Sequence, residues 1–293
     1  MNDYIVRGIA AGGTVRAFAA DTTETVAYAA EKHETYPVVS AALGRTLTAA
    51  AMMGSMMKGE DDLITLTIKG DGPIGNITVT ADSKGNVKGF AGNPIVDIPL
   101  KGPAKLDVGG AVGNGTLTVV MDLGLSEPYN GMVELQTGEI GDDLAYYFTV
   151  SEQTPSAVGL GVMVDTDWSI RHSGGFIVQM MPDVEESTIE AIEDRLANIS
   201  SVTDMLDRGM SPEDILKEIL GDLGLEITEK SPVQFHCNCD KERVSSALAT
   251  IQTADLQEMI DDGKEIEVKC YFCNSTYDFT VEELQEILNS RLG

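Results

Sequence analysis

The chain has 293 residues and a formal net charge of −27 at pH 7, because 47 acidic side chains outnumber 20 Lys and Arg side chains. Nucleic-acid binding depends largely on Lys and Arg that neutralise phosphates, and no segment of this chain is basic, so DNA and RNA are excluded as expected partners. A hydrophobic fraction of 43% excludes a wholly disordered chain, and the length favours a larger core domain with a smaller appendage.

The beginning of the chain, residues 1–10, alternates apolar and polar residues and lacks the continuous apolar run of a signal peptide. No uncharged stretch resembles a membrane span. We therefore expect a cytoplasmic protein without a membrane partner. Thiols stay reduced in that compartment, so clustered cysteines indicate metal or redox chemistry before a structural disulfide.

Residues 1–180 show the pattern of a core domain with an antiparallel sheet. Short β-branched runs separated by glycine-rich turns fill residues 63–150, and such runs favour antiparallel over parallel pairing. In chain order, the other predicted elements are two strands within 3–20 around Gly12-Gly13, helices over 25–33, about 38–58 and 141–153, and strands over 159–164 and 169–180.

Two helix starts in this domain have specific signals. Asp21 with Glu24 is typical of a capping box before the helix over 25–33. Pro37 suits the first turn of the next helix, since proline has no amide hydrogen to lose there.

Residues 181–232 are predicted to form a helical linker. The segment is acidic, and Ile189, Ile192, Leu196 and Ile199 follow each other at helical spacing. The predicted helices are short, and helices of that length are marginal alone, so the linker must gain its order by packing on its neighbours.

Residues 233–293 are predicted to form a small last unit. A strand enters Cys237, and helices near 241–249 and 255–262, a hairpin within 266–279 and a helix over 281–292 follow. At about 60 residues, a hydrophobic core alone gives marginal stability, so we expect a bound metal ion or a covalent cross-link to act as a staple that stabilises the unit. The predicted fold class is therefore α+β: an antiparallel-sheet core domain with helices, a helical linker and a small C-terminal zinc-binding domain.

All four cysteines lie in that last unit, as Cys237-Asn238-Cys239 and Cys270-Tyr271-Phe272-Cys273. Each pair is expected at a strand end or a turn, where two thiolates can point at one ion, and two such pairs complete a tetrahedron. All-sulfur ligation favours zinc. An iron–sulfur cluster is the lesser alternative, because short pairs on a hairpin resemble zinc knuckles more than ferredoxin spacings.

Spacing alone favours a purely structural zinc, since most tetrathiolate sites are closed and inert. Two features favour a switch instead. Each pair is close in sequence and can form a local disulfide once the metal has left. Structural zinc also supplies about 10–16 kcal/mol, against about 3–5 kcal/mol from such a core, so zinc loss should unfold the unit.

Several runs carry a family resemblance over nearly the whole chain. The two metal-site runs are His236-Cys237-Asn238-Cys239-Asp240-Lys241-Glu242-Arg243-Val244 and Ile266-Glu267-Val268-Lys269-Cys270-Tyr271-Phe272-Cys273-Asn274, with Tyr277 following. Further runs are Gly44-Arg45 with Leu47, Gly70-Asp71-Gly72-Pro73-Ile74-Gly75, Gly159-Leu160-Gly161-Val162, Gly174-Gly175-Phe176-Ile177-Val178-Gln179-Met180-Met181-Pro182 and Pro232-Val233. In these runs the chain resembles the redox-regulated heat-shock chaperone of the 33 kDa class, the bacterial 33 kDa chaperonin family.

The resemblance implies an ATP-independent holdase that binds unfolded or partly folded client proteins under oxidative and heat stress. It implies a form that is inactive when reduced with one zinc ion per chain, and a homodimer that is active when oxidation releases the zinc and unfolds the zinc-binding domain and linker. By position, Cys237 would pair with Cys239, and Cys270 with Cys273.

Other motifs have plainer interpretations. The run Gly70–Gly75 satisfies a dinucleotide-binding pattern, but a β-branched run and not a helix follows it, which predicts a turn between strands. The glycines within 109–115 predict a mobile loop. Core packing is favoured over a client-binding surface for Met52, Met53, Met56 and Met57. Candidate client contacts in the linker are Leu196, Ile199, Ile215 and Leu220.

Two other classes of function stay open. The zinc unit of a binding or assembly module would be permanently structural, and its cysteines would resist mild peroxide. A thiol–disulfide oxidoreductase would use Cys270 and Cys273, but that motif should open a helix after a strand, whereas a hairpin is predicted here. The scattered histidines show no acid–base pattern, so the chain is not expected to be an enzyme.

Overall fold

A computed structural model describes residues 3–103 and 105–290 of the chain. It contains two compact units, Met1–His236 and Cys237–Gly293. The first unit holds a five-stranded and a six-stranded sheet, and the second holds a two-stranded hairpin. All pairings are antiparallel except one short parallel pair, which confirms the predicted α+β class.

The five-stranded sheet, which we call sheet A, has the order β10-β1-β2-β9-β8. Its strands are β1 (Tyr4–Ala10), β2 (Val15–Asp21), β8 (Ser156–Val164), β9 (Ile170–Met180) and β10 (Glu226–Pro232). The two strands predicted around Gly12-Gly13 are β1 and β2, joined by the 3-10 turn η1 (Ala11–Gly13). The first strand of the unit and a strand close to its end are therefore neighbours in sheet A, because β10 pairs with β1.

The six-stranded sheet, which we call sheet B, has the order β11-β5-β4-β3-β6-β7. Its strands are β3 (Leu63–Gly70), β4 (Asn76–Asp82), β5 (Asn86–Ala91), β6 (Gly115–Asp122), β7 (Tyr129–Glu134) and β11 (Gln234–Phe235). Period-2 alternation in β3 buries Ile64, Leu66 and Ile68 on one face. The strand that leads to Cys237 is β11, which pairs in parallel with β5 and so belongs to the first unit.

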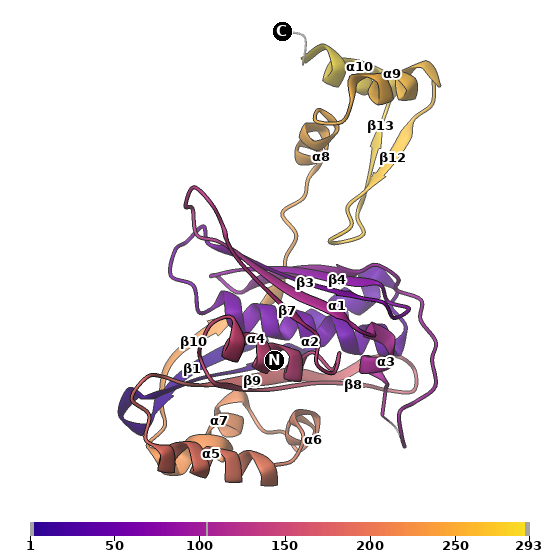
Figure 1. Cartoon of the computed structure of the whole chain (residues 1–293). Coiled ribbons are helices and arrows are strands. Elements are labelled where there is room, and N and C mark those ends of the chain that lie inside the picture. Colours follow the sequence, from indigo (N-terminus) through magenta and orange to yellow (C-terminus); the bar gives the residue numbers. More distant parts are fainter. Residues whose placement is uncertain (1–2, 104, 291–293) are drawn as a thin grey trace. The chain divides into compact units, whose positions relative to one another are not determined.

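Helix α2 (Pro37–Gly54) lies between the two sheets and forms the centre of the main core (Figure 1). Its small residues allow close packing on both sides, and its threonine hydroxyls bond to the helix itself, as Thr46 does to Ala42 O at 2.8 Å. The helix ends at Gly54, earlier than the predicted residue 58. The position requires glycine, because a Cβ there would lie 2.5 Å from Asp82 O. Met52 and Met53 are buried, so core packing is confirmed for them.

Helix α1 (Thr23–His33) corrects one prediction about its start. The predicted capping box of Asp21 and Glu24 does not form. Instead, the Asp3 carboxylate, at the start of the described chain, accepts hydrogen bonds from Glu24 N at 3.1 Å and Thr25 N at 2.6 Å. Asp21 still accepts a hydrogen bond from Thr23 N at 3.0 Å, so the helix start is capped both by this local residue and by Asp3, which no local pattern could indicate.

The glycine-rich runs lie side by side at one end of sheet B. The run from Gly70 to Gly75 is the predicted turn between β3 and β4. The segment predicted as a mobile loop contains instead the short helix α3 (Val108–Val112), capped by Asp107, which accepts a bond from Gly110 N. A Cβ on Gly70 would lie 1.9 Å from Val112 O, so the close approach of the two runs requires glycine. Helix α4 (Gly141–Val150) follows, as predicted.

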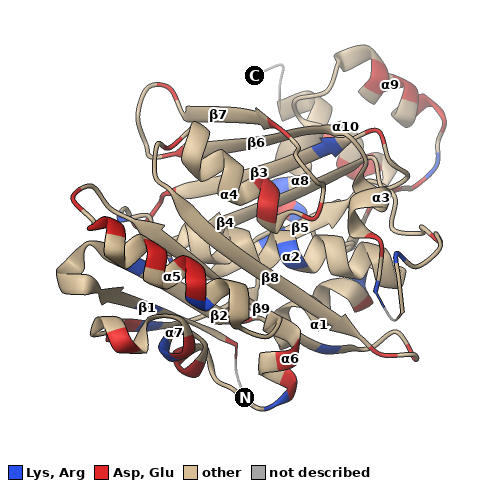
Figure 2. Cartoon of the chain, turned by 60° about the horizontal axis from the view of Figure 1, so that its bottom comes forward, with Lys and Arg blue, Asp and Glu red and all other residues tan. Residues whose placement is uncertain are grey.

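Three short helices cover the outer face of sheet A, below it in Figure 1: α5 (Glu186–Asn198), α6 (Val202–Asp207) and α7 (Pro212–Leu220). Their apolar residues and those of the sheet form a second core, whose fully buried members include Val6, Val15, Ala17, Ala19, Val178, Ile192, Met205, Ile215, Leu216 and Leu220. The predicted helices of the linker thus gain their order from the sheet. In Figure 2 their acidic residues are coloured red, most clearly on α5.

The segment predicted as helical linker also contains a strand. A 3-10 turn, η2 (Gly221–Leu223), leads into β10, which was predicted to be part of the helical segment. Its exposed, charged sequence shows no strand pattern, and pairing with β1 decides its conformation. The three-part division at residues 180 and 232 stays a prediction.

The second unit contains the helices and hairpin that the sequence predicts: α8 (Lys241–Leu248), α9 (Thr253–Asp261), β12 (Ile266–Lys269), β13 (Thr276–Phe279) and α10 (Val281–Ser290). The predicted end of the last helix, residue 292, lies outside the described residues. The buried core of the unit is small and consists of Leu248, Leu256, Phe279, Leu284, Ile287 and Leu288. Across the described residues of both units, no helix combines the length and apolarity that a membrane crossing requires.

Candidate metal centre

The four cysteine sulfurs gather at one point of the second unit. The Sγ atoms of Cys237, Cys239, Cys270 and Cys273 all lie within 4.8 Å of one another, and none of the four takes part in a disulfide. Cys239 and Cys273 Sγ are 3.2 Å apart, and Cys237 and Cys270 Sγ are 3.9 Å apart. Four sulfurs bound to one zinc ion at about 2.3 Å would lie about 3.8 Å from each other, so the spacing fits a tetrahedral metal site.

The hairpin turn positions the second cysteine pair. Strands β12 and β13 pair up to Lys269 and Thr276, and Cys270 N then donates to Ser275 O at 2.8 Å. Asn274 N donates to Cys270 O, also at 2.8 Å, and Asn274 itself adopts a left-handed φ of 61°. Asparagine tolerates that conformation better than most residues. The turn therefore holds Cys270 and Cys273 on the same side.

The start of α8 positions the first cysteine pair. Asp240 follows Cys239 directly and caps the helix, since its Oδ1 accepts a hydrogen bond from Arg243 N at 2.7 Å. The Arg243 guanidinium also donates to Asn238 O at 3.2 Å, between the two cysteines. The helix start thus fixes the backbone of the Cys237–Cys239 segment.

Two hydroxyl groups from β13 and the residue before it contact the sulfurs. Tyr277 Oη lies 3.1 Å from Cys239 Sγ and donates to Cys239 O, also at 3.1 Å. Ser275 Oγ lies 3.3 Å from Cys273 Sγ. One sulfur of each pair therefore has a hydroxyl partner. The sequence did not predict these roles, although the spacing of two residues places both side chains on one face of the strand.

The surroundings of the sulfurs shift their pKa values in opposite directions. Burial raises the pKa of the Cys239 thiol and outweighs the hydrogen bond from Tyr277, which lowers it. Burial also acts to raise the pKa of Cys273, but hydrogen bonds from Ser275 and the neighbouring thiols outweigh it and lower the pKa to about 7. Cys273 is therefore poised to be a thiolate near neutral pH, as a metal ligand must be.

The donor set defines what kind of ion this site can hold. All four ligand atoms are sulfur, three of the cysteines are half-buried, and Cys273 is buried. Soft thiolate ligands in a tetrahedral arrangement suit zinc or an iron–sulfur cluster and exclude hard cations such as Mg²⁺ and Ca²⁺. The residues therefore form a candidate metal centre.

Comparison with known proteins gives the family. A sequence profile described as Hsp33 protein matches residues 3–280. The chain belongs to the Hsp33 family. It is 59% identical over 287 residues to the 33 kDa chaperonin of Agathobacter rectalis, covering 98% of this chain and 100% of that protein. It is 56% identical over 288 residues to the 33 kDa chaperonin of Lachnoclostridium phytofermentans, covering 98% and 99% of the two chains.

A solved structure shows the same fold. The crystal structure of the 33 kDa chaperonin of Thermotoga maritima, a heat shock protein 33 homolog, superimposes with a TM-score of 0.92. That protein is 36% identical, and the match covers 100% of this chain and 99% of the other. Family membership supports a chaperone, and the names of these relatives are those of chaperonins and not of enzymes.

The Tyr277 hydroxyl leads to a first prediction. In the Tyr277→Phe variant, Cys239 Sγ loses its hydroxyl partner, and outer hydrogen bonds of this kind typically change metal affinity about 10- to 100-fold. We expect weaker zinc binding by about tenfold and faster zinc release by peroxide, measured by competition with a chromogenic chelator. Tyr271→Phe, at a 77% exposed position in the same unit, is the control and should behave as the wild type. Equal zinc affinity in the wild type and the two variants would show that the Tyr277 hydroxyl does not stabilise the bound metal.

Proposed function

We propose that this chain is a redox-regulated, ATP-independent holdase chaperone of the cytoplasm. Reduced and holding one zinc ion, it is inactive; oxidised and without zinc, it acts as a homodimer that binds unfolding client proteins and prevents their aggregation. The observation that carries the proposal is the gathering of four cysteine sulfurs in a unit whose own hydrophobic core is very small. Family membership supports the same reading.

The zinc ion is proposed to act as the staple of the second unit. Bound zinc supplies about 10–16 kcal/mol of binding free energy in small domains, which a core of this size does not replace. Within the described part of the unit, the six buried residues of the apolar cluster come from α8, α9, β13 and α10, and the four cysteines tie the hairpin to the start of α8. Removing the four ligands should therefore leave these elements without a stable common core.

Oxidation of the thiolates removes the ligands chemically. Four metal-bound thiolates and two molecules of hydrogen peroxide give two disulfides, the free metal ion and four hydroxide ions. The proposed pairs are Cys237 with Cys239, and Cys270 with Cys273. In the assembled site, close Sγ contacts also join the other combinations, Cys239 with Cys273 at 3.2 Å and Cys237 with Cys270 at 3.9 Å. The proposed pairs follow once the unit unfolds, because closing the short loops costs less chain entropy than closing the long ones.

Unfolding of the second unit is proposed to spread into the first along the chain. Cys237 follows β11 and β10, and β10 is linked to α7 through Glu213. The Glu213 carboxylate accepts from Tyr4 Oη at 2.8 Å and lies 3.1 Å from Lys230 Nζ of β10, whose ammonium also lies 3.6 Å from the Tyr4 ring centroid. Loss of β10 would weaken this cluster and then the packing of α5, α6 and α7 on sheet A. The apolar face beneath them would become available to clients.

The Glu213 cluster gives a second prediction. Burial acts to raise the pKa of Glu213, but bonds from Tyr4 and Lys230 outweigh it and hold the pKa below its ordinary value, so the group is charged at neutral pH. Glu213→Gln keeps the shape and removes the charge, at a cost of about 1 kcal/mol. Amide hydrogen exchange in α7 should then be about fivefold faster, whereas Glu218→Gln on the exposed face of α7 should leave it unchanged. If amide hydrogen exchange in α7 is unchanged in both variants, Glu213 does not stabilise the contact between α7 and β10.

The decisive experiment follows zinc and holding activity together. Reduced, zinc-loaded protein is treated with peroxide at raised temperature; zinc release is read with a metallochromic indicator, and aggregation of a thermally unfolding client by light scattering. We expect about one zinc per chain to leave as aggregation is suppressed. Peptide mapping should find the two local disulfides. If zinc stays bound, or leaves without holding activity, the metal centre is a permanent structural staple and the chain is a binding or assembly module instead.

A thiol–disulfide oxidoreductase is disfavoured by the local structure. Cys270 and Cys273 lie in a hairpin turn between β12 and β13, and no helix begins at either cysteine. The helix N-terminus that activates the attacking thiol in such enzymes is therefore missing at this motif. The protein should not accelerate disulfide exchange in a model substrate.

A further inference from the structure

The two edges of sheet A differ in how they are protected. Natural proteins blunt exposed sheet edges with charges or proline, since an open edge can pair with another chain. The edge strand β10 carries Glu226, Glu229, Lys230 and Pro232. The opposite edge strand, β8, is nine residues long and contains neither a charged residue nor a proline.

The hydrogen-bond register shows which backbone groups of β8 point outward. Met180 N donates to Pro155 O at 2.9 Å, so Pro155 and Met180 form a hydrogen-bonded pair at the end of the β8–β9 ladder. Such pairs recur at every second residue of an antiparallel ladder. The odd-numbered residues of β8 therefore bond to β9, and Val158, Leu160 and Val162 present their N–H and C=O groups to the open edge.

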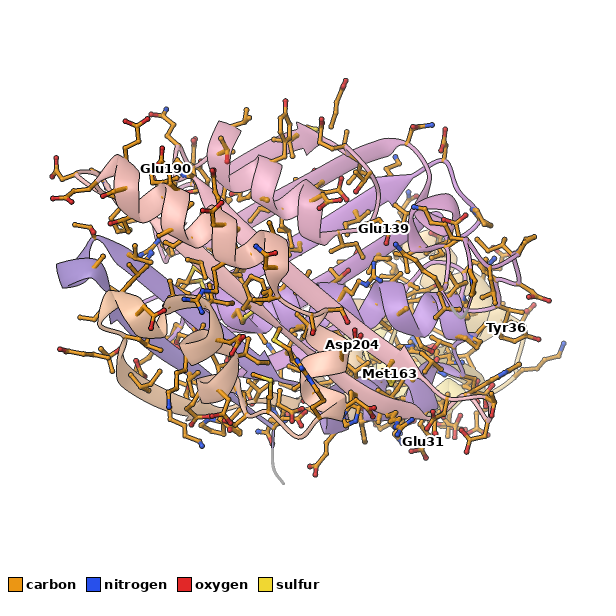
Figure 3. The ribbon with its side chains drawn as sticks, turned by 90° about the horizontal axis from the view of Figure 1, so that it is seen from below. Glu31, Tyr36, Glu139, Met163, Glu190 and Asp204 are labelled. Carbon is orange, nitrogen blue, oxygen red and sulfur yellow. The ribbon has the colours of Figure 1, made fainter. Side chains whose placement is uncertain are left out.

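A groove of about 890 Å³ runs along this edge. One wall is the first half of α2, with Pro37 and Ala41, and the other is the start of α6, with Val202 and Thr203. Gly141 of α4 approaches Val158 O and closes one end. Figure 3 labels Met163 on β8, Asp204 on α6 and Glu139 on the segment before α4, which mark the surroundings of the groove.

We propose that the open edge of β8 is a strand-addition site for an extended, unfolded segment of a client protein. The client backbone pairs with Leu160 and Val162, and its alternate side chains contact the α2 wall and the α6 wall. Backbone pairing needs no particular sequence, which suits a chaperone with many clients, and Pro37, Ala41 and Val202 on the two walls offer apolar contacts to alternate side chains of the segment.

An extended segment fits this groove better than a second copy of the chain. A single strand needs only the width between the walls, about 4.8 Å from β8 in the plane of the sheet. A second β8 would bring its own α2 and α6 against those of the first copy. The α6 wall belongs to the helices proposed to leave sheet A on oxidation, so the groove widens in the active state; in this respect the inference rests on the proposed function.

The test uses amide hydrogen exchange of the full-length oxidised protein with and without reduced, carboxymethylated α-lactalbumin, a permanently unfolded protein. We expect slower exchange in residues 156–164 when this client is bound. Unchanged exchange in 156–164 while the client is bound elsewhere would overturn the strand-addition site and leave the holdase function standing. If the oxidised protein binds no client at all, the proposed function fails as well.

A matched pair of variants tests the backbone role directly. Leu160→Pro removes the outward N–H without removing a bond to β9, and Leu160→Ala removes a similar amount of side-chain packing but keeps the N–H. Client affinity should fall at least about tenfold in the proline variant relative to the alanine variant, for the loss of one or two hydrogen bonds. Equal affinities in two folded, zinc-loading variants would contradict the proposal. If amide exchange in residues 156–164 slows with rising protein concentration when no client is present, the edge pairs with a second copy of the chain instead.

Discussion

Replacement of Cys273 by serine is expected to abolish stable zinc binding and to unfold the second unit without unfolding the first. Cys273 is the buried member of the four ligands, and its sulfur lies 3.2 Å from that of Cys239. If four thiolates share about 10–16 kcal/mol of binding free energy, losing one costs about 3–4 kcal/mol and weakens zinc binding about 10²- to 10³-fold. That loss is about as large as the whole stability of so small a core.

The expected result can be measured at two levels. Zinc content after gel filtration should fall below one per chain, and amide hydrogen exchange should lose its protection in residues 237–290 while α2 stays protected. Tyr271→Ser is the matched control, because it places serine in the same turn at a position 77% exposed. A Cys273→Ser protein that keeps both its zinc and its exchange protection would show that three thiolates suffice.

Replacement of Ile215 by aspartate is expected to release the helices of the second core while the metal centre stays intact. Ile215 is fully buried against sheet A, and it lies on the apolar face of α7 with Leu216 and Leu220. Burying an unpaired carboxylate costs several kcal/mol, and the lost apolar burial adds about 2 kcal/mol. Helices as short as α6 and α7 have no independent stability to offset this cost.

Binding of an apolar-surface dye to the reduced, zinc-loaded variant should therefore rise several-fold, and limited proteolysis should cut within residues 186–220. Lys217→Asp adds a carboxylate to the exposed face of the same helix and should leave dye binding unchanged. If reduced Ile215→Asp also suppresses client aggregation with its zinc still bound, release of the helices is sufficient for activity. Exposed surface without any holding activity would show that clients bind elsewhere.

The candidate metal centre could be predicted from the sequence because its cysteine pairs are local features of the chain. Each pair of cysteines is only a few residues apart, and the unit that contains them is too small to be stable without a staple. The hairpin and the helices that position the pairs were also predicted, since their patterns are short and regular. The hydroxyl partners were missed, because the contact of Tyr277 with Cys239 spans 38 positions and depends on how the hairpin packs against the start of α8.

The incorrect predictions in the first unit also arise from contacts between residues that are far apart in sequence. Two amides at the start of α1 donate to Asp3, which precedes β1, and no local rule predicts a carboxylate so distant in sequence. Strand β10 has an exposed, charged sequence, and only its pairing with β1 makes it a strand. The glycine-rich run within 109–115 belongs partly to helix α3, because Asp107 caps that helix and because Gly70 has no Cβ to prevent its close approach.

The fold class, the soft four-sulfur donor set and the amphipathic character of the segment after residue 180 follow from the amino-acid sequence alone, because composition and periodicity are local properties of the chain. The tertiary structure is needed to show where that amphipathic face packs, which edge of sheet A stays open and which hydroxyls contact the sulfurs. These features depend on contacts between residues far apart in sequence, and the free energy of such contacts is set by the shape of the assembled fold.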